Sequence, residues 1–172
     1  PDNYGSDRLN LLELLNMRNN YGGRNTVGSA YMTANVPFGK FKMLAGARLE
    51  YSSMELISNT RDDVASPRSR YYNNLNVFPS FNLAYAVSAA SQLRLSYGRT
   101  VNRPEFREAS SSVFYDFDLA SSVQGNTELR ECFIDNLDLR YELYPSRSEQ
   151  ISFALFYKHF DSPIEWTYTV SG

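Results

Sequence analysis

The fold is decided by the stretch Gln92-Leu93-Arg94-Leu95-Ser96-Tyr97-Gly98-Arg99-Thr100-Val101-Asn102-Arg103-Pro104. Its first half alternates strictly, with Leu93, Leu95 and Tyr97 separated by polar or small residues. Successive side chains of a β-strand face opposite sides, so this alternation gives one apolar face and one polar face. Pro104 ends the strand because proline lacks the N–H that a ladder hydrogen bond needs.

The same alternation recurs along the chain and predicts five further strands. They are expected over residues 26–36, 41–53, 77–88, 132–144 and 149–160. A last strand is expected to begin near Ile164. Residues 1–25 read as a loop with a short helix over 9–15, capped by Ser6 or Asp7.

The connections between these strands alternate in length. Short turns are expected at 37–40, 88–91 and 145–148, and long polar loops at 56–74 and 102–131. Short periplasmic turns and long extracellular loops are typical of transmembrane β-barrels. The predicted strands have roughly 10–13 residues, and a tilted strand needs roughly 9–11 to cross the hydrocarbon. Aromatic residues also gather near the strand ends, where membrane proteins carry aromatic girdles.

We therefore predict an all-β fold, an antiparallel up-and-down meander that forms an arc of a transmembrane β-barrel. The smallest such barrels have about eight strands, and fewer are firmly predicted here. Residues 1–172 are accordingly expected to be a partial outer-membrane β-barrel, with strands and loops over 26–170.

The alternation also assigns the two faces. Leu83, Leu95, Leu139 and Leu155 are expected to face lipid. The residues expected to face the lumen are Arg48, Arg94, Asp138, Arg140, Glu142 and Lys158.

A soluble antiparallel sandwich or a lipocalin-like barrel explains the alternation equally well, with the apolar face turned inward. The loop asymmetry and the aromatic content of 15% favour the membrane barrel. The net charge of −2 gives no reason to expect a nucleic-acid partner. Cys132 is the only cysteine, so an internal disulfide and a cysteine-rich metal site are both excluded.

Few residues suggest chemistry, and we expect neither an enzyme nor a bound cofactor. Asp116 and Asp118 are weak candidates for Ca²⁺ ligands, and a solvated acidic loop is the simpler interpretation. His159 lies near Asp161, but no nucleophile or second histidine accompanies them. The Gly125-Asn126 pair is most simply a turn that needs a positive φ.

Three arginines, Arg99, Arg103 and Arg107, cluster at the end of the opening strand. Arginine binds phosphate and carboxylate through paired hydrogen bonds, so an anionic ligand or lipopolysaccharide phosphates could meet them. The alternative is that they anchor the loop through pairs with Glu105 or Glu108.

Three segments together resemble the C-terminal half of the barrel of TonB-dependent outer-membrane receptors, most closely the barrel family abundant in Bacteroidetes. They are Arg94–Glu108, Gly125–Glu131 and Asp135–Glu142. The family shows an R-x-S-Y-S-x-x-x-x-R-P strand end, a G-N-P-x-L-K-P-E loop end and a strand that ends in an aromatic residue and glutamate. The residues assigned to the family motifs and their loop are Arg99, Arg103, Pro104, Gly125 and Asn126. The chain departs from the pattern at Gly98, Thr127 and Arg130-Glu131-Cys132.

The resemblance implies import of a bulky nutrient, such as a siderophore, cobalamin or a glycan. A plug domain would fill the lumen and the TonB complex would supply energy, both acting through the full-length chain. Outer-membrane lipid and a surface lipoprotein are the other implied partners. A plug-like segment is expected upstream of Pro1. Two alternatives stay open: a small structural or adhesive barrel, and an outer-membrane enzyme barrel, for which no catalytic set is found.

Overall fold

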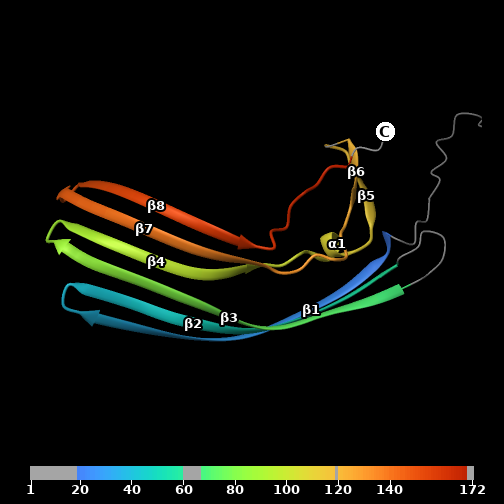
Figure 1. The fold of residues 1–172 in the computed structure, drawn as a ribbon, viewed down its shortest axis with the longest axis horizontal. Coiled ribbons are helices and arrows are strands. Elements are labelled where there is room, and N and C mark those ends of the chain that lie inside the picture. Colours follow the sequence, from blue (N-terminus) through green and yellow to red (C-terminus); the bar gives the residue numbers. More distant parts are fainter. Residues whose placement is uncertain (1–18, 60–66, 119, 170–172) are drawn as a thin grey trace, which may run out of the picture.

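A six-stranded antiparallel sheet dominates the structure, a computed structural model that describes residues 19–59, 67–118 and 120–169 (Figure 1). Its strands are β1 (Tyr21–Phe38), β2 (Phe41–Asn59), β3 (Pro67–Ser88), β4 (Ser91–Asn102), β7 (Cys132–Ser146) and β8 (Glu149–Asp161). They lie side by side in this order, so each strand pairs with its predecessor in the sheet. The predicted antiparallel meander is confirmed.

Short turns lie at one end of the sheet and long connections at the other. Two-residue turns at 39–40, 89–90 and 147–148 join β1 to β2, β3 to β4 and β7 to β8. All three are on the left in Figure 1. Gly39 has a φ of +57°, a conformation that glycine adopts without steric cost. The β4–β7 connection lies at the opposite end of the sheet.

The strand register brings apolar side chains of all six strands into line on one face. One such row consists of Val36, Met43, Leu83, Leu95, Leu139 and Leu155. These side chains are not buried against another part of the protein: Leu155, for example, is 73% exposed. A sheet that leaves such a face uncovered fits a barrel wall whose outer face meets lipid.

The opposite face is polar and concave. On β2, β3, β4, β7 and β8 it is formed by the even-numbered residues. A hollow of about 490 Å³ on this face is lined by residues from Asn35 on β1 to Ala154 on β8. Arg94, Asp138 and Arg140 line the hollow. The register places the other residues assigned to the lumen, Arg48, Glu142 and Lys158, on the same face.

The sheet is not closed over the described residues. Strands β1 and β8 each pair with one neighbour and not with each other. Within the described ranges, no helix is both long enough and apolar enough to cross a membrane.

The predicted polar loop over 56–74 is wrong for most of its length. Strand β2 continues to Asn59 and β3 begins at Pro67, so residues 60–66, which lie outside the described ranges, are all that separates them. The two strands stay paired residue by residue up to Asn59 and Pro67. Serine and asparagine are typical of loops, but in this part of the sheet the backbone N–H and C=O groups of the two strands are paired by ladder hydrogen bonds. Strand β1 likewise begins at Tyr21 rather than at residue 26.

Three further predictions concern the 102–131 connection, the region near Ile164 and the helix over 9–15. The 102–131 connection contains secondary structure that was not predicted: α1 (Phe106–Ala109) and a hairpin of β5 (Val113–Asp116) and β6 (Ser121–Gln124). The strand expected near Ile164 does not form over the described residues: the chain turns at Ser162, which has a φ of +59°, and residues 163–169 are irregular. The helix predicted over 9–15, with its caps, lies outside the described residues.

The two faces make opposite demands on neighbouring residues of β7. We expect Leu139→Arg to cost about 2–4 kcal/mol of folding free energy in lipid, because it places a charge on the face that meets hydrocarbon. Arg140→Leu, one residue along, should cost much less. Denaturant unfolding of both variants of the full-length protein in lipid vesicles measures the difference. Equal losses for the two variants would contradict the assignment of the faces.

Candidate functional site: the polar face and the segment folded onto it

The connection between β4 and β7 folds back onto the polar face of the sheet. Phe106 and Ala109 of α1 pack against Met54 and Leu56 of β2, which are only 8% and 2% exposed. Met54 and Leu56 are the apolar exceptions on this part of the polar face, and α1 covers them. Figure 1 shows α1 and the β5–β6 hairpin at the end of the sheet away from the short turns. The segment thus covers the polar face at that end only.

The same segment reaches the edge strand β1. A Cβ atom at Gly23 would lie 2.5 Å from the ring of Phe106, so only glycine leaves room for this ring. The ring of Tyr72 on β3 packs against the same cluster. The segment therefore rests on three adjacent strands.

Arg103 lies at the start of the segment and joins the buried carboxylate of Glu50 to the mostly buried carboxylate of Glu131. Its Nε is 2.7 Å from Oε1 of Glu131, and its Nη2 is 2.7 Å from Oε1 of Glu50. Glu50 is 5% exposed, and Arg48 also forms an ion pair with it. Oε1 of Glu50 and Nη2 of Arg103 are shielded from solvent and have no well-aligned hydrogen bond. Their mutual attraction is therefore what compensates for burying them.

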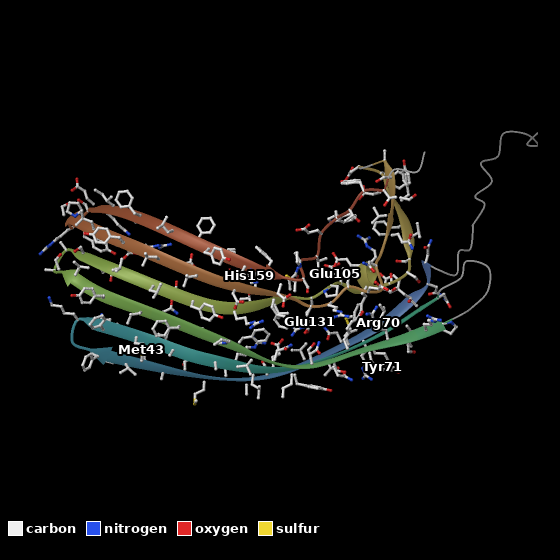
Figure 2. The ribbon with its side chains drawn as sticks, viewed as in Figure 1. Met43, Arg70, Tyr71, Glu105, Glu131 and His159 are labelled. Atoms are coloured by element: carbon white, nitrogen blue, oxygen red, sulfur yellow. The ribbon has the colours of Figure 1, made fainter. Side chains whose placement is uncertain are left out.

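Glu131 lies at the other end of the segment and connects it to β3 (Figure 2). Its Oε2 accepts hydrogen bonds from Nδ2 of Asn74 at 2.8 Å and from Nδ2 of Asn76 at 3.2 Å. The hydroxyl of Tyr72 donates to the carbonyl of Leu129 at 3.4 Å. Arg103 and Glu131 therefore tie the two ends of the segment to each other and to the sheet.

The interior of the segment is ordered by its own backbone. Glu105 and Glu108 form a capping box at α1, in which the Glu105 N–H donates to Glu108 Oε2 at 2.8 Å. The Asn126 N–H donates to the Glu108 carbonyl at 2.7 Å. A Cβ at Gly125 would lie 2.4 Å from the Ser110 carbonyl oxygen. The prediction of a positive φ at Gly125-Asn126 is wrong: neither residue has one, and glycine is needed there for close backbone approach.

The three arginines that cluster in the sequence do not converge on one site. Arg99 lies 4.0 Å from Asp135 through its Nε, and Arg107 lies over the Phe114 ring at 4.0 Å from its centroid. Arg103 is engaged by its two carboxylates. The structure therefore offers no anion site shared by all three arginines.

The alternative considered for these arginines was that they anchor the loop. Arg103 does so, but its partners are not the predicted ones. Its partners are Glu50 and Glu131, whereas Glu105 and Glu108 serve the helix cap. Glu131 is the last residue of the second motif segment, Gly125–Glu131, so the resemblance drew attention to its position. Glu50 had no such signal, because its partner is distant in sequence.

The weak candidates for metal binding have a simpler structural role. The Asp116 carboxylate accepts a hydrogen bond from the Asp118 N–H at 2.9 Å, within the β5–β6 turn. Among the residues that the structure describes, no three His, Cys, Asp or Glu side chains are grouped to hold a metal ion. His159, near the end of β8, pairs with Asp135 of β7 in the strand register (Figure 2).

A second polar cluster lies on the same face near the short turns. Glu142 is 4% exposed, and its Oε2 accepts hydrogen bonds from Gln92 at 2.5 Å and from Tyr144 at 2.8 Å. Arg94 and Arg140 approach the same carboxylate at 3.4 and 3.9 Å. The cluster therefore holds two half-exposed guanidinium groups beside one buried acid.

A comparison with protein families explains this combination of an apolar convex face and a polar concave face. The outer membrane protein beta-barrel family matches residues 3–171. The chain belongs to this family. It is therefore an outer-membrane protein, and its sheet is barrel wall. Comparisons with curated proteins and with solved structures gave no match. In a barrel of this family the apolar face meets lipid and the concave face lines the lumen.

The buried Arg103 network can be tested by breaking and then repairing it. Arg103→Met leaves Glu50 and Glu131 buried without their cation, and loss of one partner of a buried pair costs about 3–5 kcal/mol. Adding Glu50→Gln and Glu131→Gln removes the stranded charges and should recover most of that loss. Denaturant unfolding of the full-length protein in detergent measures each free energy.

Arg99→Met is the matched control. Its half-exposed pair with Asp135 should contribute under about 1 kcal/mol. If Arg103→Met is as mild as this control, the network does not hold the segment in place.

Proposed function

We propose that this chain forms part of the wall of a TonB-dependent transporter that imports a bulky nutrient through a plugged barrel. The nutrient would belong to the siderophore, cobalamin or glycan class. The proposal rests on the sequence resemblance over Arg94–Glu108 and Gly125–Glu131, and it is compatible with the family match. Its partners would be the plug and TonB, outer-membrane lipid and a surface lipoprotein.

The observation that carries the proposal is the small size of many side chains on the lumen face. Gly46, Ser80 and Gly98 lie in one register row across β2, β3 and β4. Ala84 and Ala154 lie two rows away on the same face, in the row that also holds Lys42, Arg94 and Arg140. Barrels of about eight strands fill their interior with side chains, whereas barrels of roughly 16–18 strands keep an open lumen. Short side chains on the inner face suit the wide lumen that a plug and a bulky substrate need.

The open edges of the sheet require a barrel with more strands than the structure describes. The outward edges of β1 and β8 have no strand partner among the described residues. Unpaired backbone N–H and C=O groups are not tolerated in lipid, so further strands must flank both edges in the membrane. We propose that the full-length chain supplies them.

The segment anchored by Arg103 fits a transporter. By the usual orientation of such barrels the long connections face the outside of the cell, so α1 and the β5–β6 hairpin would lie at the outer entrance. A segment fixed on the inner side of the wall narrows the entrance and gives it a defined shape. A substrate would meet this surface before it reaches the lumen.

Deletion of the full-length gene from its own bacterium tests the proposal. Uptake of labelled ferric siderophores, cobalamin and oligosaccharides is measured in deleted and complemented cells. We expect one class to lose uptake and to regain it only in complemented cells with a working TonB, because TonB would supply the energy.

Normal uptake of all three classes, together with increased sensitivity of the envelope to detergent, would contradict transport. That result would favour the structural barrel instead.

A further inference from the structure

Three basic residues lie close together on the lumen face. Arg94 of β4 and Arg140 of β7 are direct partners in the strand register. Lys42 of β2 lies in the same row, separated from Arg94 only by Ala84 of β3. All three basic side chains line the 490 Å³ hollow.

This arrangement leaves positive charge without a full counterpart. Like charges directly opposite each other on a sheet destabilise it. Glu142 is the one carboxylate within 4.0 Å of Arg94 and Arg140 in the described structure, and it also binds Gln92 and Tyr144. The two arginine side chains remain 52% and 57% exposed.

The rest of the hollow adds little negative charge. No ion pair joins Lys42 to any residue of the described ranges. Asp138 is the one acidic residue that lines the hollow in the described structure, and Asn82 and Ser96 are neutral hydrogen-bonding neighbours. Three cations therefore lie beside two carboxylates, Glu142 next to the arginines and Asp138 in the hollow, which leaves one positive charge in excess.

The contrast with Arg103 shows why these arginines are available to a ligand. The guanidinium of Arg103 is held by two carboxylates and its side chain is 23% exposed. Arg94 and Arg140 share one carboxylate at longer distances, and their remaining N–H groups are free to meet a solute. The planar guanidinium presents paired donors that match the oxygens of a carboxylate or a phosphate.

We propose that Lys42, Arg94 and Arg140 form an anion-binding site on the lumen wall. Its ligand is a carboxylate or phosphate group carried by a solute that passes through the lumen. The inference rests on the proposed transport function and adds to it: the transported nutrient is anionic.

Binding of two simple anions to the purified full-length protein in detergent tests this site. Isothermal titration calorimetry is run with citrate, with pyrophosphate and with uncharged sucrose. We expect citrate or pyrophosphate to bind, and sucrose not to bind. Arg94→Gln and Arg140→Gln should each weaken the binding about tenfold, because each removes a charge-assisted hydrogen bond. Whichever of citrate and pyrophosphate binds with the higher affinity shows whether the site prefers a carboxylate or a phosphate group.

Lys158→Gln is the matched control. It removes one positive charge from the same face but lies outside the hollow, so the affinity should not change. Thermal unfolding of every variant verifies that it is folded. Failure of both anions to bind the wild-type protein would overturn the site, and so would equal affinity in the Arg94→Gln/Arg140→Gln double variant.

This measurement is independent of TonB and of a membrane. Absence of anion binding would leave the transport proposal standing. Anion binding in a protein whose deletion spares all uptake would refute transport and retain the site.

Discussion

Lipid offers no hydrogen bonds to the backbone, and this constraint shapes the whole chain. The antiparallel ladders pair the backbone groups of six strands, and their register fixes which side chains share a face. Leu95 and Leu139 are partners on one face, and Arg94 and Arg140 are partners on the other. A slip of one residue between β4 and β7 would place one of the two arginines on the lipid face. The pairing that satisfies the backbone therefore also separates the lipid face from the lumen face.

The lumen face has two differently built ends. At the end away from the short turns, β2 carries Met54, Leu56 and Glu50, which the β4–β7 connection buries. The ionic groups there are enclosed and serve to fix that connection. At the other end Arg94 and Arg140 stay half-exposed beside one acid. The difference in burial thus separates two roles: the enclosed Arg103 stabilises the fold, whereas the half-exposed Arg94 and Arg140 can contact a solute.

The sequence was sufficient for the central parts of the six main strands, for the short turns and for the alternation of apolar and polar side chains, because alternation with a period of two residues is a local signal. It was insufficient wherever distant segments decide the structure. Serine and asparagine near Asn59 and Pro67 resembled a loop, yet they belong to paired strands. Glu50 and Arg103 come together only after the connection folds back. Glycine is required at position 125 because the Ser110 carbonyl leaves no room for a Cβ atom, and not because the residue has a positive φ.

The most direct test of the two-faced wall is a spin-label scan of β4 in the full-length protein, reconstituted in bilayers. Single cysteines are placed in turn at residues 92–97, with Cys132 replaced by serine, and each nitroxide is tested for collision with oxygen and with a water-soluble nickel complex. We expect alternation: labels at Leu93, Leu95 and Tyr97 collide with oxygen from the lipid, and labels at the intervening positions collide with nickel. Alternation of the opposite phase, or none, would contradict this expectation.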